Sequence, residues 1–226
     1  MTDHYHMDLT QFSLLKFKQI LEEGDVLPGR KILKEKLTER FATLEAAGIH
    51  NLRDLLDALK SKEKIEIFAK QYDLPENYLV ILRREANSYL PKPFNICEIP
   101  DVDPEFTDRL AAAGIKNTRH LFDRAKTRHD RDDLSRLADI PTTDLLELVK
   151  LSDLARINGV GPVFARLFYN AGADTLEKLA ASSPHELFEK LQAINTAKKY
   201  TKIMATVKDV AFCITMAREL PNSIEY

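Results

Sequence analysis

The sequence contains no tryptophan, only two cysteines, and no apolar stretch long enough to cross a membrane. Cys97 and Cys213 are far apart and belong to no Cys-x-x-Cys or Cys/His cluster, which argues against a zinc site or a disulfide framework. We interpret each as a buried free thiol. The opening residues, Met-Thr-Asp-His-Tyr-His, lack the basic and apolar regions of a signal peptide, so we expect a cytoplasmic protein without a membrane partner.

The chain also lacks an excess of positive charge and a recognisable catalytic motif. Its formal net charge is −2, whereas a dedicated duplex-binding protein carries a basic excess because its affinity comes from neutralising phosphates. There is no Gly-rich P-loop, Ser-His-Asp set, Cys-His pair or set of metal ligands at recognisable spacing. We therefore predict that the protein is not an enzyme and uses no cofactor, metal or small-molecule substrate.

A glycine signal that recurs along the chain predicts helices joined at steep angles. Each of three glycines follows a pair of small residues, as at the left-handed end of a helix, and a short polar residue that can cap the next helix stands three positions later. Such a pattern is typical of two helices joined by a short turn. The glycines are Gly48, Gly114 and Gly172, and the capping residues are Asn51, Asn117 and Thr175.

The spacing of these signals indicates a duplication. Gly48 and Gly114 are 66 residues apart, and Pro75 and Pro141 follow them at the same distance. The third unit begins sooner and has Lys199 where the proline would stand, so we interpret it as a shortened capping version. The fold class predicted is all-α, with tandem helical repeats and no sheet.

Two prolines mark the clearest domain boundary. The segment Leu90-Pro91-Lys92-Pro93 favours an extended linker, because proline ends a helix and restricts the residue before it. We predict an N-terminal helical domain over residues 1–91 with the first unit, and a C-terminal helical domain over 94–226 with the second and third units.

The most specific chemical signal is the hairpin Asn158-Gly159-Val160-Gly161, followed by Pro162. Either glycine can adopt positive φ, Val160 can anchor the turn in the core, and proline suits the first position of a helix. Free N–H groups at that helix start would suit a phosphate oxygen. The simpler alternative is a helix–helix corner that binds nothing.

An earlier hairpin, Ile99-Pro100-Asp101-Val102-Asp103-Pro104, aligns with residues 157–162 but has aspartates in place of both glycines. Carboxylates would repel a phosphate, so we interpret this hairpin as structural only. Four basic side chains near the later hairpin are candidate phosphate contacts, with a solvated helix face as the alternative for the lysines. They are Arg166, Lys198, Lys199 and Lys202.

The segment Ile157–Pro162, with Ala171-Gly172 and Asp174-Thr175-Leu176, resembles a helix-hairpin-helix motif. More narrowly, the chain resembles a bacterial domain-of-unknown-function family built of such units, through phrases similar to residues 78–85, 153–157 and 220–226. The resemblance implies sequence-independent contact with the nucleic-acid backbone through the amides of Gly159, Val160 and Gly161. Binding members usually place a basic residue just after the hairpin, where this chain has Val163.

Two functions remain open from the sequence. The first is a non-enzymatic nucleic-acid-binding protein, favouring DNA, whose contact through Gly159–Gly161 and the basic group is weak, non-specific and dependent on salt. The second is a scaffold for protein partners, in which tandem helical units present grooves and the hairpins are only corners. We place the first ahead because its claim is the more concrete.

Overall fold

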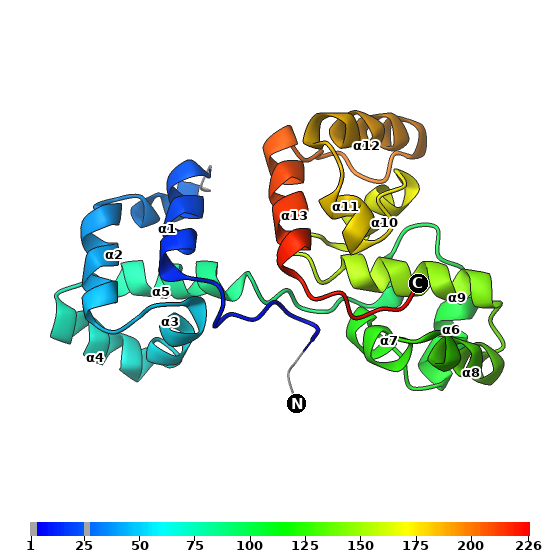
Figure 1. The fold of residues 1–226 in the computed structure, drawn as a ribbon, viewed down its shortest axis with the longest axis horizontal. Coiled ribbons are helices and arrows are strands. Elements are labelled where there is room, and N and C mark those ends of the chain that lie inside the picture. Colours follow the sequence, from blue (N-terminus) through cyan, green and yellow to red (C-terminus); the bar gives the residue numbers. More distant parts are fainter. Residues whose placement is uncertain (1–3, 25–27) are drawn as a thin grey trace. The chain divides into compact units, whose positions relative to one another are not determined.

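The computed structural model describes residues 4–24 and 28–226 and contains two compact units (Figure 1). The N-terminal unit is Asp8–Tyr89, and the C-terminal unit is Leu90–Tyr226 together with the chain start up to Met7. Every regular element of the described residues is a helix, which confirms the predicted all-α class. The predicted N-terminal domain, 1–91, included residues 4–7, which the structure assigns to the other unit.

Among its described residues, the N-terminal unit contains five α-helices and one 3-10 helix around an apolar core. Ser13 caps the first helix by accepting a hydrogen bond from the Lys16 N–H at 3.1 Å, and Asn51 caps the third by accepting from Asp54. The helices are α1 (Leu14–Glu23), the 3-10 helix η1 (Pro28–Leu33), α2 (Leu37–Ala46), α3 (Leu52–Ala58), α4 (Lys62–Tyr72) and α5 (Glu76–Asn87).

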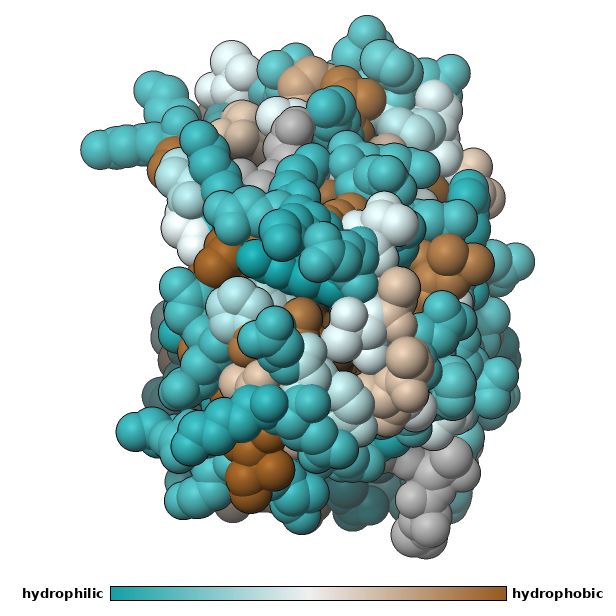
Figure 2. Space-filling model, turned by 90° about the vertical axis from the view of Figure 1, so that its left-hand side faces the viewer, coloured by the Kyte–Doolittle hydropathy of each residue, from teal (hydrophilic) through white to brown (hydrophobic). Residues whose placement is uncertain are grey.

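The face of the N-terminal unit that Figure 2 shows is largely hydrophilic, and its apolar groups are small and separated. Its exposed large apolar side chains are Leu15 on α1 and Ile67 on α4. A broad contiguous apolar patch, the usual mark of a stable protein interface, is not seen on this face.

The C-terminal unit contains eight α-helices and one short 3-10 helix among its described residues. Asn117 and Thr175 cap helices as predicted, each accepting a backbone N–H three positions later. The elements are η2 (Ile96–Glu98), α6 (Pro104–Ala112), α7 (Thr118–Arg124), α8 (Arg128–Ala138), α9 (Thr142–Leu154), α10 (Pro162–Asn170), α11 (Leu176–Ala180), α12 (Pro184–Lys198) and α13 (Val207–Glu219).

Three sets of four α-helices follow one another along the described chain: α2–α5, α6–α9 and α10–α13. A shift of 66 residues places α3 on α7 and α4 on α8 with identical bounds. In each set the second and third helices contact the fourth: α3 and α4 with α5, α7 and α8 with α9, and α11 and α12 with α13. The third set is therefore not shortened as the sequence suggested. Its third helix simply ends on left-handed Lys199, where the other sets use Asp73 and Asp139.

Left-handed residues end the helices where the glycine signal placed them. Gly48, Gly114 and Gly172 have φ of +84°, +85° and +83°, a conformation that costs glycine little. The two cysteines differ from each other: Cys213 is buried in α13, but Cys97 is exposed in η2, so the prediction of a buried thiol fails at Cys97. The cause is local, because η2 has three residues and only Ile96 among them is buried.

Candidate nucleic-acid interface

The hairpin between α9 and α10 has one glycine in the left-handed conformation and one in the extended conformation. Gly159 has φ of +84°, whereas Gly161 has φ of −92° and ψ of −176°, so only Gly159 needs the freedom predicted for both. Val160 is 5% exposed and donates its N–H to the Ile157 carbonyl at 3.1 Å. Val160 thus anchors the turn, and Pro162 opens α10 as the sequence predicted.

The start of α10 is open to a ligand. Gly161 is its N-cap and has no side chain to accept the first helical N–H groups, which have no partner within the helix. Apart from the adjoining residues, no heavy atom lies within 4 Å of the position that a Cβ would take at Gly159 or Gly161. No side chain therefore covers the positive end of the helix dipole at these two glycines, and such helix starts bind anions.

The matching hairpin before α6 makes the same turn, but one of its own carboxylates caps the start of that helix. Asp101 takes the left-handed conformation, with φ of +56°, at the position that aligns with Gly159. Asp103, which aligns with Gly161, accepts the Glu105 N–H at 2.9 Å and caps α6. The first hairpin therefore fills the helix start that the second leaves empty.

Arg166, a predicted phosphate contact, faces the protein interior instead. Its side chain is 4% exposed and its Nη1 donates to the Glu147 carboxylate at 2.7 Å. Its Nε donates to the Pro100 carbonyl at 2.7 Å, in the first hairpin. Arg166 thus ties α10 to α9 and to the first hairpin, and it supports this region from within rather than reaching a phosphate.

The lysine group lies at the other end of α10. Lys198 Nζ is 3.1 Å from an Asp101 carboxylate oxygen, to which the Tyr200 hydroxyl also donates. These hydrogen bonds, from Tyr200 first and then Lys198, lower the pKa of Asp101. The Tyr200 hydroxyl in turn accepts from Asn170, the last residue of α10, at 3.2 Å. Part of the charge of Lys198 is therefore offset by Asp101.

The predicted site is thus two clusters rather than one. From Gly161 to Asn170 the helix rises roughly 13 Å, at about 1.5 Å per residue. Gly159, Val160 and Gly161 lie at the start of α10, and the exposed Lys199 and Lys202 follow Lys198 in the loop beyond its end. A separation of roughly 13 Å equals the axial rise of about four nucleotides in one strand.

Residues 100–220 match the protein family described as Domain of unknown function (DUF4332), and they make up more than half of the chain. The chain belongs to this family. No curated protein and no solved structure matches it significantly. The DUF4332 region begins within the first hairpin and continues just past α13, so it includes the second hairpin and the lysines.

The DUF4332 region folds around a buried arginine whose partners lie partly outside it. Arg156 is 1% exposed, at the end of α9, and its guanidinium is paired with the Asp153 carboxylate. It also donates to three backbone carbonyls near the chain ends, those of His4 at 2.9 Å, Tyr5 at 3.0 Å and Pro221 at 2.8 Å. Arg156 is therefore the centre of a buried cluster, a role that the sequence analysis did not assign to it.

The final residues complete the same cluster. The Tyr226 hydroxyl donates to Asp153 Oδ2 at 2.8 Å, and the Glu225 N–H donates to the Lys126 carbonyl at 2.9 Å. Burial raises the pKa of Asp153, and the guanidinium of Arg156 opposes that rise. Residues 4–7 and 221–226 therefore belong structurally to the DUF4332 unit, although the family match stops short of both.

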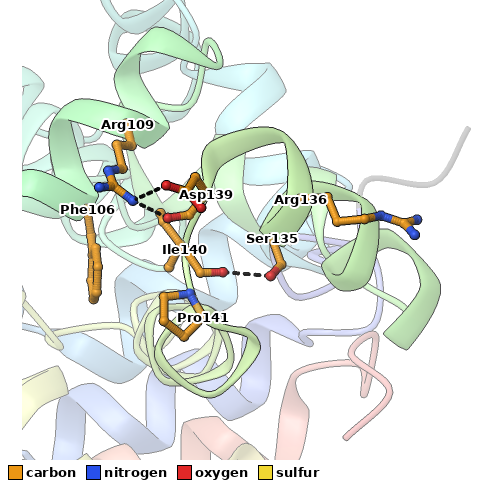
Figure 3. A pocket seen from close by; sticks show the side chains of 7 residues that line it. All are labelled: Phe106, Arg109, Ser135, Arg136, Asp139, Ile140 and Pro141. Atoms are coloured by element: carbon orange, nitrogen blue, oxygen red, sulfur yellow. Dashed lines mark hydrogen bonds and ion pairs between the residues drawn. The ribbon is translucent and has the colours of Figure 1, made fainter.

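A surface hollow of the same unit lies between α6 and α8, and its polar groups are occupied by the protein (Figure 3). Arg109 donates to the Asp139 carboxylate at 2.9 Å and to its carbonyl. Ser135 donates to the Ile140 carbonyl at 2.6 Å, and Arg136 points away from the hollow (Figure 3). These bonds hold the turn between α8 and α9, and we assign the hollow no ligand.

Among residues 4–24 and 28–226, no three His, Cys, Asp or Glu side chains come together as a metal site. Within the same residues, no helix combines the length and apolar character needed to cross a bilayer. The absence of enzymatic activity stays a prediction.

Proposed function

We propose that this DUF4332 protein is a non-enzymatic nucleic-acid-binding protein built of tandem helix-hairpin-helix-like units, and that its hairpin Gly159–Gly161 contacts the phosphate backbone without regard to sequence. The contrast between the two hairpins carries the proposal. In the same turn, Asp103 caps the amide of Glu105, while Gly161 leaves the start of α10 uncapped and unobstructed. An oxyanion of a ligand can take the place at α10 that Asp103 takes at α6.

Lys199 and Lys202 add the charge that the hairpin lacks. Both are exposed, and neither forms an ion pair with another described residue. A strand passing along α10 would meet the hairpin amides at one end and these lysines at the other, about four nucleotides apart. With two lysines neutralising phosphates, the slope of log K against log salt for duplex DNA is about −2. We expect weak binding that favours DNA and weakens as salt rises.

Fluorescence anisotropy of labelled single-stranded and duplex DNA over a salt series tests the proposal. Gly161→Asp copies Asp103: it places a carboxylate and a cap on α10, and the extended backbone with free space around Gly161 accepts the side chain without strain. Gly29→Asp is the matched control, because it adds the same charge in the N-terminal unit, where a Cβ also meets nothing within 4 Å.

We expect wild type and Gly29→Asp to bind DNA with the same affinity. Folded Gly161→Asp should bind DNA at least about tenfold more weakly, which corresponds to a loss of about 1.4 kcal/mol in binding free energy. Equal weakening by both variants would point to net charge rather than to the hairpin. If wild type fails to bind at low salt, the scaffold function takes its place. One observation favours that second candidate: Arg166 and Lys198 are engaged by Glu147 and Asp101, which removes two cations from the predicted set.

A further inference from the structure

The loop between α12 and α13, residues 199–206, exposes an apolar side chain. Ile203 is 81% exposed, more than any other large apolar side chain of the described residues. Lys202 precedes it and is exposed as well. An exposed isoleucine alone needs no explanation, but this one is held in place by the loop.

Two pairs of hydrogen bonds fix the backbone that presents Ile203. The Asn195 side chain accepts the Thr201 N–H and donates to the Thr201 carbonyl, both at 3.0 Å. The Thr201 hydroxyl then accepts the Ile203 N–H at 3.1 Å and donates to the Ile203 carbonyl at 3.0 Å. The exposed tip is therefore organised before any partner arrives, which lowers the entropy cost of binding through it.

The surroundings of Ile203 are basic. No Asp or Glu occurs between Glu189 and Asp209, and within that interval lie five lysines. Lys198 is engaged by Asp101, while Lys199 and Lys202 precede the tip in the same loop and have no ion-pair partner among the described residues. An exposed apolar side chain beside such cations is complementary to a polyanion that has apolar surface beneath its charges.

We infer that Ile203 is a wedge that inserts between the bases of the bound nucleic acid while Lys199 and Lys202 contact the flanking phosphates. This inference rests on the proposed function and adds a second contact to it. Single apolar side chains wedge between base steps and partly unstack them. An anionic bilayer is the weaker fit, because stable attachment needs more than one apolar anchor and the next residue, Met204, is only partly exposed.

Binding to a DNA duplex that contains 2-aminopurine tests the wedge, because the fluorescence of this base rises when it is unstacked. Three variants of the full chain are compared with wild type: Ile203→Ser removes the wedge, Ile203→Leu conserves it, and Lys202→Gln removes one charge. At 81% exposure the isoleucine contributes little to folding, so these proteins should remain folded. Circular dichroism checks this.

If Ile203 is a wedge, Ile203→Ser should raise the Kd for DNA by about fivefold and abolish the rise in 2-aminopurine fluorescence, while the salt dependence of binding stays the same. Ile203→Leu should behave like wild type, and Lys202→Gln should reduce the salt slope by about 0.9 while keeping the rise at saturation. If Ile203→Ser binds and unstacks DNA like wild type while Gly161→Asp still fails to bind, the wedge is overturned and the hairpin function stands. If only binding to phosphatidylserine vesicles depends on Ile203, a membrane contact replaces the wedge. If wild type binds no nucleic acid, both proposals fall.

Discussion

Replacing Arg156 by methionine should destabilise the C-terminal unit strongly, because it leaves a buried carboxylate without its cation. Arg156 and Asp153 have side chains that are 0% and 3% exposed. Breaking a buried ion pair by removing one partner costs about 3–5 kcal/mol. The carbonyls of His4, Tyr5 and Pro221 would also lose their donor. For a chain of this size, the expected fall in Tm is about 6–20 °C.

Removing both Arg156 and Asp153 should reduce the stability of the unit less than removing Arg156 alone. In the double variant Arg156→Met, Asp153→Leu no charge remains buried, and such replacements are often close to neutral. The comparison is made by thermal melts followed by far-ultraviolet circular dichroism. Arg136→Gln is the control, because the Arg136 side chain is 76% exposed and pairs with Asp133 on the surface of α8, so its loss should change stability by less than about 0.5 kcal/mol.

The pH dependence provides a second check on the same reasoning. A carboxyl whose folded pKa is raised above its unfolded value destabilises the fold at high pH, and the penalty disappears as falling pH protonates it. Burial raises the pKa of Asp153, and loss of Arg156 removes the opposing charge. The loss of stability caused by Arg156→Met should therefore become smaller as the pH falls from about 7 toward 4. A single variant that loses less than about 1 kcal/mol at neutral pH, or less than the double variant does, would refute this account.

Three further outcomes are expected. Deleting residues 1–7 should lower the Tm of the C-terminal unit, because it removes fully buried Tyr5 and two acceptors of the central guanidinium; an unchanged melt would contradict the structure. In the native protein a thiol reagent near pH 8 should modify exposed Cys97 but not Cys213, whose pKa burial raises to about 12, and denaturant should make both reactive. Tyr200→Phe removes the main hydrogen bond that lowers the pKa of Asp101, so carbon-detected NMR titration should show that pKa rising toward its ordinary value.

The local geometry of this fold could be predicted from single residues whose chemistry permits few conformations. Glycines at helix ends, the caps Asn51 and Asn117, and Pro162 at the start of α10 all behave as their residue types require. The third four-helix set was interpreted as a shortened version because its unit begins sooner and has Lys199 where a proline would stand. Lys199 ends α12 in the left-handed conformation, and α13 begins after a longer loop.

Tertiary partners could not be predicted, because they depend on contacts between distant residues. Arg166 and Lys198 have the composition of a phosphate site, but Glu147 and Asp101 meet them only in the folded unit. A signal for Arg156 did exist: it stands in the run from Leu151 to Ile157, where every residue proves to be buried. A charge within such a run is buried with a partner more often than it is solvated.

The cluster around Arg156 also determines the order in which the chain can complete its fold during synthesis. Its carbonyl acceptors at His4 and Tyr5 are translated more than two hundred residues before Pro221 and Tyr226. The intervening Asp8–Tyr89 unit has its own core and can form as soon as it leaves the ribosome. His4 and Tyr5 must therefore wait for about 150 further residues to be translated before Arg156 is made, about 8–30 s at ordinary elongation rates. The Tyr5 side chain, which is buried in the folded unit, stays exposed during that interval, which makes the nascent chain a candidate for chaperone capture.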